Sequence, residues 1–157
     1  MESNYRIGEY ITDFVSIYEI TSIGTEKENR LIHYRPIKGT DKVFIASIPE
    51  KNLEKASLRK LLTKKEIKVL LDKLKTPLDD YVFDARQIKE DIYSNNPEKL
   101  IDYLKYFYRK EEELIKLEND LKEEILNHLC MEISFVTDKN NSSIKKMIES
   151  DLVGKKA

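Results

Sequence analysis

The first third of the chain has an alternating pattern of apolar and polar residues. Between Tyr5 and Ile48 the apolar positions are mostly β-branched or aromatic, fall in short runs and have poor helical periodicity. Polar segments separate the runs, and we expect a hairpin loop at residues 24–29 and a turn at residues 38–41. Short strands with frequent turns predict a small antiparallel barrel or curled sheet. After the hairpin loop, residues 31–35 and 43–48 are expected to form two more strands.

The pattern changes to a helical period at Thr63. Thr63 and Glu66 have the spacing of a capping box, in which each side chain accepts a hydrogen bond from the other residue's backbone N–H. The helix should end before Pro77, because the residue that precedes a proline is disfavoured in the α region. One apolar stripe follows the cap, at Ile67, Leu70, Leu71 and Leu74.

Helical patterns then continue almost to the end of the chain. Asp79 or Asp80 is the expected cap of a second helix that runs to Tyr93. Asn96 as N-cap with Pro97 at the first helical position begins the next helix. The apolar stripe from residue 100 to residue 133 is too long for one helix in a compact domain, so we expect a turn near residues 110–115. A polar loop at residues 137–143 and a short last helix complete the pattern.

Together these patterns predict an α+β fold in two parts. Residues 1–55 form the small N-terminal antiparallel β barrel and residues 56–77 a connecting loop and helix. Residues 78–157 form an all-α helical bundle.

The balance of basic and acidic residues limits the kind of nucleic-acid contact that we expect. The chain has 28 basic and 29 acidic residues, whereas a protein that holds nucleic acid tightly by itself normally has a basic surplus. A nucleic-acid contact is therefore expected to be local, or to need a partner that delivers it. The apolar runs are shorter than the roughly 20 residues that span a bilayer, and the N-terminal residues lack the apolar core of a signal peptide. We expect a soluble cytoplasmic protein with no membrane partner.

Candidate catalytic chemistry is sparse. The chain has four glycines and no glycine-rich phosphate loop, and its two histidines have no suitable partners in sequence. Cys130 is expected to be a core or boundary thiol, and the acidic residues, interleaved with lysines, are typical of a solvated helix face. We expect that the protein is not an enzyme and that it has no cofactor, metal site or small-molecule substrate. The aromatic cluster of Tyr103, Tyr106, Phe107 and Tyr108 is expected to be helical core, with a base-stacking platform as the alternative.

The order of parts carries a family resemblance. A β unit is followed by Ile48-Pro49 and Asn52, then by Ser57-Leu58-Arg59, then by the capped helix that ends in Lys-Thr-Pro, and after that by helices. Together with the opening Tyr-Arg-Ile-Gly-Glu at residues 5–9, this resembles the CarD/CdnL family of bacterial transcription regulators. The resemblance covers about residues 5–135.

The resemblance implies a Tudor-like, SH3-like barrel that binds the β subunit of RNA polymerase. It also implies a helical domain that lies against upstream promoter DNA and stabilises or modulates the open complex. The DNA-binding candidates are Tyr81, Arg86 and Lys89. For the polymerase contact we expect a sheet edge, with Thr25, Lys27 and Ser47 as the candidate residues.

The chain also departs from the family pattern. It has no tryptophan, and Tyr81 aligns with the tryptophan that the family inserts in the minor groove. The arginine pair that usually follows is replaced by Phe83 and Asp84, and an acidic residue near phosphate is unfavourable. A protein-interaction adaptor without a DNA contact is therefore the first alternative. The others are a small enzyme with an unrecognised site and a stand-alone DNA-binding repressor.

Overall fold

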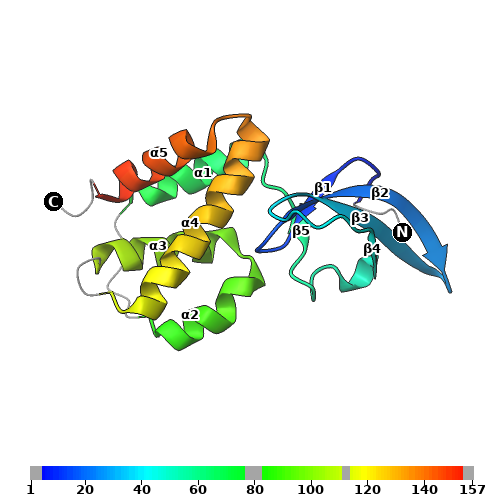
Figure 1. Ribbon diagram of the computed structural model, residues 1–157, viewed down its shortest axis with the longest axis horizontal. Helices are drawn as coiled ribbons and strands as arrows, with labels where there is room; N and C mark the ends of the chain where they lie inside the picture. The colour runs from blue at the N-terminus through cyan, green and yellow to red at the C-terminus, as the bar shows by residue number, and fades with distance from the viewer. Residues whose placement is uncertain (1–4, 77–82, 111–113, 154–157) are drawn as a thin grey trace. The chain divides into compact units, whose positions relative to one another are not determined.

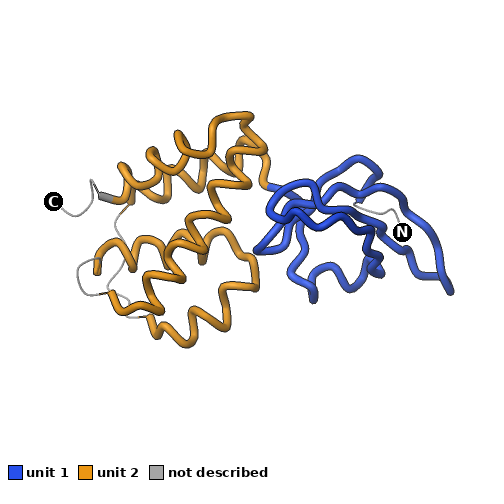
Figure 2. Tube along the Cα trace, in the orientation of Figure 1, with its two compact units in different colours: residues 1–61 blue, residues 62–157 orange. Residues whose placement is uncertain are grey.

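The computed structural model describes residues 5–76, 83–110 and 114–153. The chain divides into two compact units, residues 1–61 and 62–157 (Figure 2). Within the described ranges the fold is α+β, with an antiparallel sheet of five strands followed by five α-helices (Figure 1). The boundary between the units falls inside the predicted connection at residues 56–77, and the helix expected there belongs to the second unit.

The sheet has the strand order β4-β3-β2-β1-β5. Every neighbouring pair is antiparallel. Among the described residues the hydrogen-bonded order ends at β4 and at β5, so the sheet is open, and closure into a Tudor-like barrel stays a prediction. The strands are β1 (Tyr10–Thr12), β2 (Ile17–Glu26), β3 (Asn29–Lys38), β4 (Ala46–Pro49) and β5 (Arg59–Lys60).

The hairpin between β2 and β3 is tighter than predicted. Glu26 already pairs with Asn29, which leaves a turn of two residues, Lys27 and Glu28. Their φ angles are 47° and 69°, the left-handed values that make a two-residue turn fit the twist of the strands. The loop expected at residues 24–29 was therefore too long, and residues 24–26 belong to β2.

Strand β4 begins later than predicted. Residues 43–45 were expected to be strand, but β4 starts at Ala46, which pairs with Tyr34. Continuing this register would place Phe44 opposite Pro36, which has no N–H to donate to the ladder. The apolar run that precedes β4 therefore lies outside the sheet.

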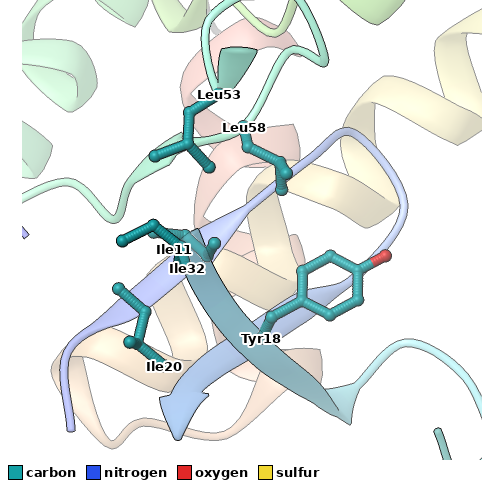
Figure 3. Close-up of a cluster of buried hydrophobic side chains, with 6 residues drawn as sticks. All are labelled: Ile11, Tyr18, Ile20, Ile32, Leu53 and Leu58. Atoms are coloured by element: carbon teal, nitrogen blue, oxygen red, sulfur yellow. The ribbon is translucent and has the colours of Figure 1, made fainter. Parts of the chain in front are cut away.

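The core of the first unit lies between the sheet and the segment that follows β4 (Figure 3). A 3-10 helix at Glu50–Asn52 leads into Leu53, and the backbone N–H of Leu58 donates to the Leu53 carbonyl at 2.9 Å. Leu58 therefore anchors the Ser-Leu-Arg motif in the core, and Arg59 begins β5. The buried cluster is Ile11, Tyr18, Ile20, Ile32, Leu53 and Leu58.

The predicted caps of the second unit are confirmed where they involve Thr63 and Asn96. The Thr63 hydroxyl accepts the Glu66 N–H at 3.1 Å, and the Glu66 carboxylate accepts the Thr63 N–H at 3.0 Å. The Asn96 side chain accepts the N–H groups of residues 98 and 99 at 3.1 and 3.3 Å. The helices are α1 (Lys64–Leu74), α2 (Ala85–Asp91), α3 (Pro97–Arg109), α4 (Lys116–Thr137) and α5 (Asn141–Val153).

The second helix starts later than predicted. Asp84 caps α2 by accepting the Arg86 N–H at 2.9 Å, and the expected caps Asp79 and Asp80 lie outside the described residues. A 3-10 turn, η2 (Ile92–Ser94), follows α2. The break between α3 and α4 is confirmed, and the loop expected at residues 137–143 is shorter, because α4 extends to residue 137 and α5 begins at residue 141.

The stripes of apolar residues on these helices meet in one core. α3 and α5 both pack against α4, and Phe107 and Leu126 have no exposed surface. Tyr103, Tyr106 and Tyr108 are each at most 7% exposed, so the prediction of an aromatic core is confirmed and these rings are too buried to form a base-stacking platform. None of the helices in the described ranges is both long and apolar enough to cross a bilayer.

Candidate functional site

The edge strand β4 offers one candidate surface. It pairs with β3 on one side, and in the described part of the chain it is the last strand on that side of the sheet. The residues that lead into it are apolar and exposed: Val43 is 99% exposed and Ile45 72%. Phe44 is partly covered, because its ring lies near Tyr18 of β2, with 6.5 Å between the two ring centroids. An exposed apolar segment beside an open strand edge is the usual feature of a protein-binding surface.

Ser47 lies on this edge strand, on the face of the sheet opposite the core. It is exposed, and its hydroxyl group is 2.6 Å from Nδ1 of His33, its partner on β3. The contact fixes the imidazole orientation on the outer face. Of the three residues predicted to contact polymerase, Ser47 is the one that the structure places at the edge.

Thr25 and Lys27 lie elsewhere in the sheet. Thr25 is near the end of β2, and β3 separates β2 from β4. Strand alternation places Thr25 on the same face as Ile23, which packs on the core, whereas Ser47 is on the outer face. Lys27 is in the hairpin turn. The structure therefore does not bring the three predicted contact residues into one surface.

Helix α2 is the second candidate surface. Arg86 and Lys89 are both exposed and lie three residues apart, so they share a side of the helix, while Ile88 is 1% exposed and anchors the opposite side. No ion pair joins Arg86 or Lys89 to another residue in the described ranges. Tyr81, the third predicted DNA-binding residue, lies outside the described residues.

A pocket of about 510 Å³ adjoins α2 and changes the electrostatics of this surface. Among the described residues, three carboxylates line it, together with one cation, Lys99, and with Phe83 and Tyr103. The carboxylates, Asp84, Glu90 and Asp91, belong to α2 or cap it. The basic pair of α2 is thus adjacent to acidic groups, which weaken its attraction for phosphate.

Asp91 attaches α2 to α3. Its Oδ2 accepts a hydrogen bond from the Tyr103 hydroxyl at 2.6 Å and lies 3.3 Å from Nζ of Lys99. The tyrosine hydrogen bond is the main cause that lowers the pKa of Asp91 below its ordinary value, with Lys99 adding to it. Burial and the same hydrogen bond raise the pKa of Tyr103. This link holds the helix that presents Arg86 and Lys89.

The aromatic ring of Phe83 strengthens the same attachment. It packs edge-on against Tyr103 and Tyr106, with both centroid distances at 5.2 Å. Such edge-to-face pairs contribute about 0.5–1.5 kcal/mol each beyond the area they bury. Phe83 stands where the family pattern has an arginine, and in the structure it packs against the helical core.

Cys130 and His128 are buried in the helical core. Burial raises the pKa of the Cys130 thiol to about 11, so the thiolate that a nucleophile requires is disfavoured. His128 Nε2 is 3.1 Å from the Asn95 side-chain oxygen and 3.8 Å from Glu132 Oε1. In the described part of the chain, no group of three or more His, Cys, Asp or Glu residues is placed to hold a metal ion.

Glu132 is a buried carboxylate that the sequence pattern did not indicate. It is fully buried, and its Oε2 accepts the backbone N–H of Leu62, seventy residues away, at 2.8 Å. The prediction that the acidic residues form a solvated face was wrong here. The carboxylate has a structural function, because it satisfies a backbone donor just before α1.

Comparisons with known proteins add no identification. No family model matches the chain, and no curated protein matches it. The resemblance to the CarD/CdnL family therefore depends on the residues quoted from the sequence and on the order of the two units.

Proposed function

We propose that this chain is a non-enzymatic transcription regulator that binds the β subunit of bacterial RNA polymerase through the edge of its sheet. In this proposal the sheet is part of a Tudor-like barrel. The helical unit lies near upstream promoter DNA and stabilises or modulates the open complex. The observation that carries the proposal is the exposed apolar segment of Val43 and Ile45 that leads into the open edge of β4.

The edge has the properties that strand addition requires. Unpaired backbone groups of an edge strand can pair with a strand of a partner, and neighbouring side chains supply specificity. Val43 and Ile45 would bury apolar surface in the complex, at about 25 cal/mol for each Å² removed from water. Ser47 would contact the partner from the outer face, beside His33.

The DNA contact is expected to be weak and dependent on polymerase. Arg86 and Lys89 provide two cations, and the neighbouring carboxylates reduce their effect. Polymerase would hold the helical unit close to DNA, where an effective concentration on the order of millimolar makes a weak contact sufficient. This agrees with the near-neutral balance of 28 basic and 29 acidic residues.

Binding of the full chain to an isolated fragment of the polymerase β lobe tests the proposal. Ile45→Asp should weaken binding at least tenfold, because it places a charge in the apolar contact. Val69→Asp is the matched control, since Val69 is 61% exposed but lies on α1 in the other unit. Absence of binding by the unmodified chain, or equal losses in the two variants, would contradict the proposal.

An adaptor without a DNA contact is the second candidate function, and the acidic lining beside α2 favours it. Replacing Arg86 and Lys89 together by Gln separates the two. The regulator should have a weaker effect on open-complex lifetime while it keeps its binding to the β lobe. An adaptor would keep both properties.

A further inference from the structure

The exposed side of α1 carries a concentration of positive charge. Lys64, Lys65, Lys68 and Lys75 are all exposed, whereas Ile67, Leu70 and Leu74 bury the opposite side of the helix. These four lysines, here named the α1 lysine face, extend from the first residue of α1 to its C-cap, Lys75, a length of about 16 Å at about 1.5 Å per residue. They stand in a chain whose net charge is only −1.

Among the described residues of the second unit, the α1 lysine face is not paired with carboxylates. In the described ranges no ion pair joins any of the four to a carboxylate, although Lys73 on the same helix lies 3.3 Å from Oδ1 of Asp102. Glu66 is occupied in the cap of the helix, where its carboxylate accepts the Thr63 N–H. Asp72 is the carboxylate that remains on the exposed side of α1.

Two of these lysines also occupy unfavourable positions for helix stability. Lys64 and Lys65 are in the first turn of α1, where the helix dipole is positive and a cation is unfavourable. The cost of placing them there is not offset by an ion pair within the described part of the unit. A bound polyanion would reverse this cost, because its charge would favour both the lysines and the helix N-terminus.

We propose that the α1 lysine face binds the phosphate backbone of duplex DNA without regard to sequence. This extends the DNA contact of the proposed function from α2 to a second helix, and it rests on that DNA contact rather than on the polymerase contact. Phosphates follow one another every 3.4 Å of helix axis along one DNA strand, so a row of about 16 Å faces roughly five of them. The lysines are long and flexible and need no base-specific geometry, which suits a contact that follows the backbone.

The test uses the full chain and a short fluorescent DNA duplex, with binding followed by anisotropy over a series of salt concentrations. In the test variant all four lysines of the face are replaced by Gln, which preserves helix propensity. In a second variant they are replaced by Arg, which keeps the charge. The charge-matched control replaces four exposed lysines elsewhere by Gln: Lys51, Lys116, Lys139 and Lys146.

The Gln variant should bind at least tenfold more weakly, and the slope of log K against log salt should fall by about 0.9 for each DNA phosphate that the variant no longer neutralises. The Arg variant should keep both the affinity and the slope. Equal losses in the test and control variants would overturn the proposal, as would a failure of the unmodified chain to bind the duplex at low salt.

The β-lobe fragment separates this inference from the proposed function. The Gln variant should bind that fragment as tightly as the unmodified chain. If it loses the fragment and the duplex affinity is unchanged, the face contacts an acidic protein surface and the DNA assignment is overturned. If the unmodified chain binds the duplex but not the fragment, the polymerase proposal fails while the inference about the α1 lysine face stands.

Discussion

The hydrogen bond between Tyr103 and Asp91 should control how firmly α2 is held. Tyr103→Phe removes the donor and leaves the ring in its contact with Phe83, 5.2 Å away, so the change isolates the polar link. The hydroxyl donates to a charged carboxylate at 2.6 Å, and hydrogen bonds to charged groups contribute about 1.5–3 kcal/mol. Asp91 is 27% exposed, so the lower end of this range applies. We expect a loss of about 1.5 kcal/mol in the free energy of unfolding.

The loss of stability caused by Tyr103→Phe should depend on pH. The pKa of Asp91 is lowered in the folded state, so its stabilising contribution is present above the ordinary value of 3.8 and is lost as the pH falls through the folded value. The difference between the unmodified chain and Tyr103→Phe should therefore be greatest near neutral pH. It should narrow as the pH falls below about 4.

Urea unfolding followed by circular dichroism at several pH values provides the measurement, since helix signal reports on the second unit. A double-mutant cycle with Asp91→Asn gives the coupling energy between the two side chains and removes the contribution of Lys99. A coupling below about 0.3 kcal/mol at neutral pH, or a difference that widens in acid, would refute this account of how α2 is attached.

Other predictions concern each unit separately. Gly8 and Gly39 have φ angles of +89° and +91°, so alanine at either should cost about 1–2 kcal/mol in backbone strain. Gly39→Ala should lower the free energy of unfolding by urea about 1–3 kcal/mol more than Gly8→Ala does, because its Cβ would lie 2.5 Å from the Val15 carbonyl oxygen. Equal losses of stability in the two variants would exclude this clash. Cys130 should not react with a thiol reagent at mildly alkaline pH until the protein is unfolded, and rapid reaction of the native protein would contradict its burial. Thr63→Ala should lower the free energy of unfolding of the helical unit by about 1 kcal/mol, and an unchanged midpoint would contradict the capping box.

Local signals in the sequence predicted local structure well. The capping box of Thr63 and Glu66 is complete within four residues, and so is the start of α3 at Asn96 and Pro97. In each case the residues that decide the helix start are neighbours in the chain, so no knowledge of the tertiary fold is needed. The switch from strand to helix near residue 63 belongs to the same class of signal.

Non-local relations could not be predicted in this way. The late start of β4 depends on Pro36, which faces that segment only because of the strand register. The buried Glu132 depends on a backbone N–H seventy residues away. The candidate site is non-local as well: the sequence proposed Thr25 and Ser47 for one edge, but strand order and alternation place them on different strands and faces.

The distribution of charge relates the DNA contact proposed for the helical unit to the partner contact proposed for the sheet edge. A near-neutral chain can contact DNA only where its cations are concentrated, and the described cations without ion pairs concentrate on α1 while those on α2 adjoin carboxylates. Such a contact is strongly weakened by salt, because its free energy comes from counterion release. At physiological ionic strength it would need a second attachment that keeps the helices near DNA, and in the proposed function the sheet edge at β4 would provide it. The apolar edge would then determine where the protein acts, and the lysines would determine how long the DNA is held.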